Sequence, residues 1–204
     1  MIKFTCYIDT SSYINLSKSE YKSGSILDIL YKKTNIRFCP FINHTEIPNH
    51  HNSNMPGSLK RSSQVYYLSK LDYDRDHDLL FPHSSSNNDR GEKENLMCLF
   101  DHYLDKKKKG LIFLTDDKKA LDGQLNHPIS SFPLFKVWSS FDVILFLLIE
   151  KEITKEIAQS AIQDLNAIMA TDDEKMDPQK TQLRIQVRAT YEKRIKLLNK
   201  LIYS

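Results

Sequence analysis

Carboxylate side chains lie beside several apolar runs of this sequence, at positions from which they could share one cation. Asp9 directly follows an apolar run near the N-terminus, and Asp116 and Asp117 follow another. Sites in open parallel sheets form beyond the carboxyl ends of the strands, so we expect Asp9 and Asp117 to converge. Two predicted helices would bring Glu46 and Glu92 to the same place.

Carboxylates gathered in one pocket repel one another unless a cation lies among them. Oxygen ligands of this kind favour Mg²⁺ or Mn²⁺, which are hard ions that keep several waters. Such an ion can activate water and stabilise the charge on a phosphodiester during hydrolysis. The residue types therefore predict a divalent metal site, whose candidate ligands are Asp9, Glu46, Glu92, Asp116 and Asp117.

Each of these acids also has a purely structural explanation. Asp9 could cap a helix, although the Thr and Ser residues that follow it can do the same. Asp116 and Asp117 could form a solvated turn, and Glu92 could complement the dipole of the helix that it starts. Glu46 could be an ordinary surface carboxylate. These alternatives stay open on the residues alone.

The elements that must position these acids follow from hydrophobic spacing. Strands are predicted within residues 1–10, 36–39, 111–114 and 135–138. Helices are predicted around residues 13–16, 26–31, 41–47, 96–109, 141–149, 153–169 and 179–202. Strands that alternate with helices indicate an α/β fold. We expect a three-layer α/β/α sandwich with a central, mainly parallel sheet and a C-terminal helical extension.

Residues 48–90 differ in kind from their surroundings. Two polar stretches flank an aromatic and charged piece at 65–81, so we interpret the whole as an insertion with one short ordered element. We expect this insertion to lie within a domain formed by residues 1–165. An acidic break then separates that domain from an extension, residues 171–204, whose apolar stripe packs on the domain or on a second chain.

Composition excludes several classes of protein. Among 204 residues, 40% are hydrophobic and the formal net charge is only +3, which excludes an intrinsically disordered chain. The longest apolar run, 141–149, is too short for a membrane span, and the N-terminus lacks the pattern of a signal peptide. Three widely spaced cysteines favour free thiols over disulfides or a zinc site, so we expect a cytoplasmic protein.

Four short motifs, in order, resemble those of the PIN-domain nucleases. They are YIDTSSYINL at 7–16, FCPFINHTEI at 38–47, GEKENLMCLF at 91–100 and FLTDDKKAL at 113–121. The family has Asp-Thr-Ser after its first strand, Glu on the helix after strand two, an acid that starts a later helix, and Thr-x-Asp after the next strand. The resemblance covers residues 1–60 and 90–165 and implies four catalytic acids, which are Asp9, Glu46, Glu92 and Asp117. The 48–90 insertion and the last helix depart from the family pattern.

The resemblance implies a metal-dependent endonuclease that cleaves single-stranded or structured RNA with Mg²⁺ or Mn²⁺ and leaves a 5′-phosphate. Ser11 or Thr115 would orient water or phosphate, and Lys118 and Lys119 would meet the phosphates of the substrate. Toxin-type members of the family pair with a protein antitoxin. By analogy, an antitoxin-like inhibitor is an expected partner. Apart from this analogy, a second copy of the chain is another expected partner, through the apolar stripe of the last helix.

Two other functions remain open. The first is a catalytically inactive, PIN-like module that binds a protein, and the second is a phosphatase-like hydrolase that acts on small phosphate esters. The sequence has no GxxxxGK[ST], GxGxxG or GxSxG motif, so nucleoside triphosphate, dinucleotide and serine-hydrolase chemistry lack support. Tyr66, Tyr67 and Tyr73 could stack on unpaired bases, or could cover an edge of the sheet.

Overall fold

The computed structural model describes residues 4–21, 24–50, 64–82, 85, 89–106, 110–117 and 135–173, together with 189, 193, 196 and 200. The chain forms two compact units, of which the first comprises Met1–Ile14 and Tyr31–Trp138 and the second comprises Asn15–Leu30 and Ser139–Ser204. The candidate site lies in the first unit. The division into 1–165 and 171–204 stays a prediction.

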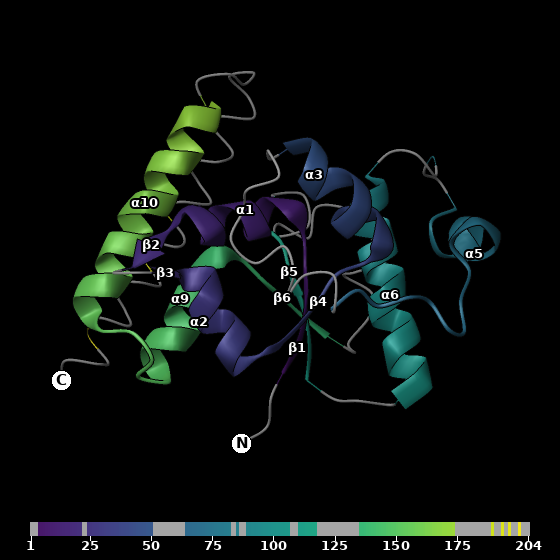
Figure 1. The fold of residues 1–204 in the computed structure, drawn as a ribbon, viewed down its shortest axis with the longest axis horizontal. Helices are drawn as coiled ribbons and strands as arrows, with labels where there is room; N and C mark the ends of the chain where they lie inside the picture. Colours follow the sequence, from purple (N-terminus) through teal and green to yellow (C-terminus); the bar gives the residue numbers. More distant parts are fainter. Residues whose placement is uncertain are drawn as a thin grey trace. The chain divides into compact units, whose positions relative to one another are not determined.

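A four-stranded sheet forms the centre of the first unit (Figure 1). Its order is β4-β1-β5-β6, and every neighbouring pair is parallel. The strands are β1 (Thr5–Ile8), β4 (Asn35–Arg37), β5 (Leu111–Leu114) and β6 (Phe135–Trp138). All residues of β1 and β5 are buried, which explains why the central strand β5 reads as a continuous apolar run. The predicted α/β class is confirmed.

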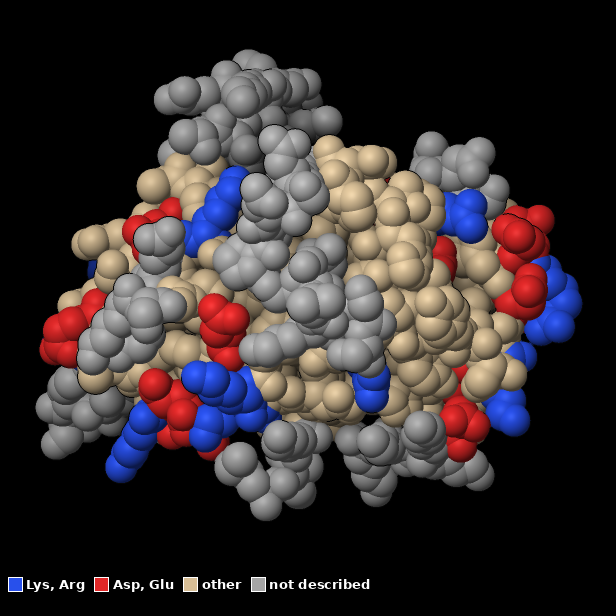
Figure 2. Space-filling view, in the orientation of Figure 1, with Lys and Arg blue, Asp and Glu red and all other residues tan. Residues whose placement is uncertain are grey.

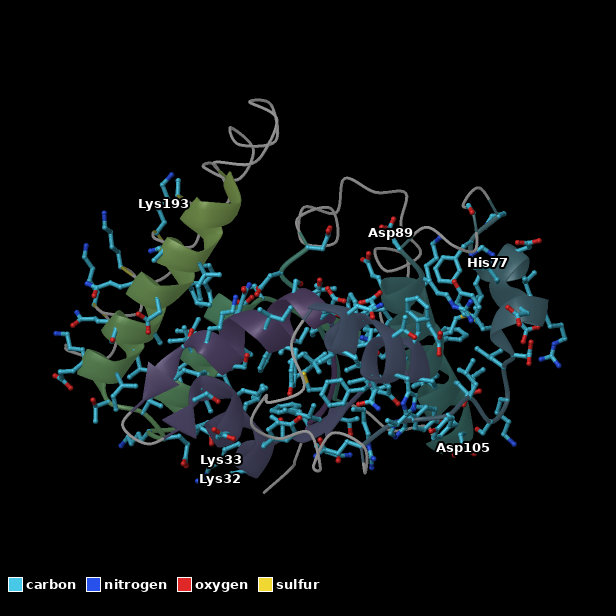
Figure 3. All side chains as sticks on the ribbon, turned by 45° about the horizontal axis from the view of Figure 1, so that its top comes forward. Lys32, Lys33, His77, Asp89, Asp105 and Lys193 are labelled. Carbon is cyan, nitrogen blue, oxygen red and sulfur yellow. The ribbon has the colours of Figure 1, made fainter. Side chains whose placement is uncertain are left out.

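Helices of the first unit carry or support the candidate acids. They are η1 (Ile42–Glu46), which continues into α3 (Ile47–His50), α5 (Tyr73–Leu80) and α6 (Arg90–Lys106). Two further helices, α1 (Thr10–Lys18) and α2 (Ile26–Lys33), pass from one unit to the other along the chain. Helix α6 packs against β1 and β5, and it lies between the sheet and α5 in Figures 1 and 3.

Within the described part of the predicted insertion, one residue is bridged to the sheet and a helix follows. Val65 forms a parallel bridge with Phe38, whose N–H donates to the carbonyl of Gln64 and whose carbonyl accepts from the N–H of Tyr66. The chain then reaches α5, where Asp72 accepts the N–H of Arg75 as the N-cap. One short ordered element was predicted here and is confirmed. Residues 51–63 lie outside the described residues.

A buried carboxylate fastens this segment to α6. Asp101 accepts five hydrogen bonds of 2.6–2.9 Å from the hydroxyls of Tyr66 and Ser69 and from the N–H groups of Ser69, Lys70 and Leu71. These donors outweigh the effect of burial and lower the pKa of Asp101. The ring of Tyr66 also stacks on His102 at 5.0 Å, so the segment that leads into α5 is firmly held.

The described residues of the second unit form a short hairpin, parts of α1 and α2, and two further helices. Strands β2 (Glu20–Tyr21) and β3 (Gly24–Ser25) are antiparallel, and they escaped prediction because two residues carry no periodicity. Helix α9 (Ser140–Ile149) begins with a capping box formed by Ser139 and Asp142, and it packs against α10 (Lys155–Asp173). Most of the predicted helix at 179–202 lies outside the described residues.

Two expectations from composition can be compared with the structure. The thiols of Cys6, Cys39 and Cys98 are free and buried, as the cysteine spacing predicted. Within the described part of the chain, no helix combines the length and the hydrophobicity that crossing a membrane requires.

Candidate functional site

Asp9 lies at the carboxyl end of β1 and is largely buried, with 9% of its surface exposed. Its N–H donates to the carbonyl of Leu114 at 2.8 Å, and its carbonyl accepts the N–H of Tyr13 at 2.9 Å. The bond from Tyr13 is the first backbone hydrogen bond of α1, so Asp9 itself occupies the N-cap position. The helix starts at Thr10 without an intervening turn, so the cap is Asp9 and not one of the Thr and Ser residues that follow it.

Two hydroxyls hold the carboxylate of Asp9. Ser11 donates to Oδ2 at 2.9 Å, and Thr115, at the end of β5, donates to the same oxygen at 3.1 Å. Each hydroxyl also accepts a backbone N–H, that of Asp116 on Ser11 at 3.4 Å and that of Asp117 on Thr115 at 2.9 Å. The carboxyl ends of β1 and β5 therefore converge, as their parallel pairing predicted.

Glu46 approaches from the helix that follows β4. The segment Ile42–Glu46 is π-helical, and the N–H of Ile47 bonds to the carbonyl of Ile42, five residues earlier. Short π-helical turns are frequent at functional sites. Here the widened turn carries Glu46 to α1, where its Oε2 accepts a hydrogen bond from the hydroxyl of Thr10. The second predicted acid is thus joined to the residue next to Asp9.

The Gly-Glu pair at the start of α6 lies against Glu46. A β-carbon on Gly91 would stand 2.6 Å from the carboxylate carbon of Glu46 and 2.8 Å from its Oε2, with Oε1 closer still. Only glycine leaves room for the carboxylate here. Glu92 is half-buried in the first turn of α6. It directly follows the glycine that contacts Glu46.

Asn95 fixes the start of α6 relative to the sheet. Its side chain is fully buried, donates to the carbonyl of Ile8 at 2.9 Å and accepts the N–H of Cys39 at 3.0 Å. These two backbone groups belong to the carboxyl ends of β1 and β4. Sequence reasoning overlooked Asn95, and the only signal was an amide next to the apolar run that begins at Leu96.

The electrostatics of the site follow from burial and from the pairing of two acids. Burial raises the pKa of Asp9 from 3.8 to about 6, against the opposing effect of the hydrogen bond from Ser11, and the charge of Glu46 raises it further. A divalent cation bound to the two acids would offset both the burial and the mutual repulsion.

The donor set of this site suits a hard cation, because it consists of carboxylate and hydroxyl oxygens. Among the described residues, no group of three or more His, Cys, Asp or Glu side chains is arranged to hold a metal ion. The pair formed by Asp9 and Glu46 is therefore the strongest feature for cation binding. The backbones of Asp116, Asp117 and Glu92 flank this pair.

The predicted site residues thus have different outcomes. Asp9, Ser11, Glu46, Thr115, Asp116 and Asp117 are connected through the hydrogen bonds and the charge coupling given above. Glu92 directly follows Gly91, which contacts Glu46. Lys118 and Lys119 lie outside the described residues. Thr10, Gly91 and Asn95 were not expected to contribute, and the contacts of all three join parts of the chain that are distant in sequence.

Comparison with known proteins gives no matching family model, no matching curated protein and no matching solved structure.

Proposed function

We propose that this protein is a metal-dependent endoribonuclease of PIN type that uses Mg²⁺ or Mn²⁺ to hydrolyse phosphodiester bonds. The observation that carries the proposal is the pair of acids at the carboxyl ends of the sheet. Asp9 is buried and held by Ser11 and Thr115, and Glu46 accepts a hydrogen bond from the adjacent Thr10. The four motifs that resemble PIN-domain nucleases contribute the residues of this region. The PIN-like, three-layer arrangement and the four-acid site are part of the same proposal.

Asp9 and Glu46 would hold the cation, with Glu92, Asp116 and Asp117 as the further acids beside them. When bound, the cation would supply positive charge to the phosphate and would lower the pKa of water. The chain itself keeps the carboxylate of Asp9 in one orientation through the hydroxyls of Ser11 and Thr115. Thr10 does the same for Glu46, so the ligands are preorganised before a substrate arrives.

A protein-binding module without catalysis is the second candidate. The observation in its favour is that Asp9 serves as the N-cap of α1 and that two hydroxyls already satisfy one of its oxygens. In that case the acids would be structural, and the protein would bind its partner through another surface. Activity separates the two candidates.

The proposal is tested with a labelled single-stranded RNA incubated with wild-type protein in Mn²⁺ or in EDTA. We expect cleavage in Mn²⁺ alone and 5′-phosphate ends on the products. Asp9→Asn should reduce the rate about 100-fold or more, because a metal contributes several kcal/mol to the transition state. A generic phosphomonoester in parallel tests the phosphatase-like alternative.

Asp105→Asn is the matched control, because this exposed acid lies at the end of α6 opposite Gly91 (Figure 3). It should cleave at the wild-type rate within about twofold, as surface substitutions change little. Equal rates for wild type and Asp9→Asn would refute the nuclease and favour the protein-binding module. Turnover of the phosphomonoester but not of RNA would favour the phosphatase.

A further inference from the structure

Tyr67 is an exposed aromatic residue on the described part of the insertion. It leaves 64% of its surface open to solvent, although it follows a segment that is bonded to the sheet. Its hydroxyl lies 3.4 Å from Nε2 of His44, which is itself exposed. The pair presents two aromatic side chains that meet through the hydroxyl of Tyr67 on the surface, and the hydrogen bond limits how far either ring can turn.

The topology places this pair at the same end of the sheet as the candidate site. Val65 is bridged in parallel to Phe38, which follows β4, so the chain continues from there past the carboxyl end of the sheet to Tyr67. Two strand spacings separate this chain from β1, which amounts to roughly 10 Å. Asp9 lies at that end of β1, and His44 lies two residues before Glu46.

The other aromatic residues of the insertion are already engaged. Tyr66 stacks on His102 and donates to Asp101, and Tyr73 is 6% exposed beneath the guanidinium of Arg90, which lies 4.8 Å from its ring centroid. Helix α5 is mainly acidic, and Figure 2 shows red and blue side chains next to one another on that part of the surface. The acidic side chains of α5 make this helix a poor surface for a polyanion.

We propose that Tyr67 and His44 form a stacking platform for one base of a single-stranded RNA whose backbone runs to Asp9 and Glu46. This inference rests on the proposed function and names the substrate class of the same site. Aromatic rings that bases can stack on are the usual contacts of single-stranded nucleic acid, and they tolerate any sequence. Tyr67 thus supplies a substrate contact from the insertion, outside the four motifs, whereas His44 belongs to the motif at 38–47.

The test measures binding without cleavage. A fluorescently labelled single-stranded RNA is titrated in EDTA with wild type, Tyr67→Ala, Tyr67→Phe and Leu79→Ala, and anisotropy gives the Kd. Stacking of one base changes affinity by roughly 5- to 150-fold, so Tyr67→Ala should weaken binding about tenfold or more. Tyr67→Phe keeps the ring and should stay within about twofold of wild type. Leu79→Ala removes an apolar side chain that is 80% exposed on α5 and should bind as wild type does.

Each outcome separates this inference from the nuclease proposal. Equal Kd values for wild type and Tyr67→Ala, or no binding of RNA by wild type, would refute the stacking platform. The nuclease proposal is tested separately, by the cleavage assay. Weaker binding by Tyr67→Ala supports the platform even if Asp9→Asn leaves cleavage unchanged. Equal melting temperatures of the four proteins will show that the differences in Kd do not come from unfolding.

Discussion

The carboxylate of Glu46 lies directly against the α-carbon of Gly91, with 2.6 Å between its carboxylate carbon and the position that a β-carbon would take. This contact joins the helix after β4 to the start of α6. It also explains why a glycine precedes Glu92, since any larger residue would meet the carboxylate.

Gly91→Ala is therefore expected to displace Glu46 while leaving the fold intact. The clash falls on the end of a flexible side chain, and alanine favours a helix over glycine by up to about 1 kcal/mol. We expect an unchanged or slightly higher melting temperature and about tenfold slower RNA cleavage. A stable variant with full activity would show that the position of Glu46 is unimportant for the reaction.

Asp9→Asn should stabilise the metal-free protein at neutral pH. The pKa of Asp9 is higher in the folded state, at about 6, than its usual 3.8. Between these values the folded state binds more protons, so the free energy of unfolding falls as the pH rises from about 4 to about 6. Asparagine does not titrate, so the variant keeps the free energy of unfolding that the wild type loses. This difference amounts to about 3 kcal/mol for two pKa units.

Urea denaturation of both proteins in EDTA at pH 4 and pH 7 measures this effect. The variant should be more stable than wild type only at the higher pH. Its amide oxygen can still accept hydrogen bonds from Ser11 and Thr115. Mn²⁺ at pH 7 should then stabilise the wild type and leave the variant unchanged, because ligands that bind only the folded state raise its stability. A variant that is less stable at pH 7 in EDTA would contradict the burial of a charged Asp9.

Asn95→Ala should destabilise the protein by roughly 2–4 kcal/mol. The substitution leaves the carbonyl of Ile8 and the N–H of Cys39 buried without their present partner, and each such group costs about 1–3 kcal/mol. Asn166→Ala, on the half-exposed surface of α10, is the matched control and should change stability by less than about 0.5 kcal/mol. Equal denaturation midpoints for the two variants would refute this role for Asn95.

Asp101→Asn should also destabilise the protein, with the opposite pH dependence from Asp9. The lowered pKa of Asp101 means that its charged form stabilises the fold above the usual carboxyl range and that this stabilisation is lost as the pH falls. Asp101 accepts through both carboxylate oxygens, whereas asparagine has a single accepting oxygen. We therefore expect the free energy of unfolding to fall by about 3 kcal/mol at pH 7. The difference from wild type should shrink toward pH 3, and a difference that is constant with pH would contradict the prediction.

The sequence predicted the strands and helices that have long apolar patterns. β5 is buried on both faces and its sequence is continuously apolar, and α9 begins close to the start of the helix predicted around residues 141–149. The hydrogen-bond partners of Asn95 could not be predicted, because they are backbone groups 56 and 87 residues away. Local periodicity contains no information about such contacts.

The sequence predicted where in the fold the acids of the candidate site lie, but not which residues they contact. Asp9 and Asp117 follow strands, and parallel pairing was enough to expect them at one end of the sheet. The π-helical turn that carries Glu46 has no signature in the sequence, and neither has the hydroxyl of Thr10 that meets it. The sequence left the N-cap open between Asp9 and the Thr and Ser residues that follow it, because Thr and Ser cap helices equally well.

The bridge between Phe38 and Val65 also affects how the protein can associate with itself. Both backbone groups of Phe38 that point outward from the sheet are taken by Gln64 and Tyr66. A strand from another molecule that added along β4 would have to stop at this residue, and a short accessible edge is a poor template for intermolecular β-pairing. Substitutions that release Val65 should thus promote aggregation before they abolish folding.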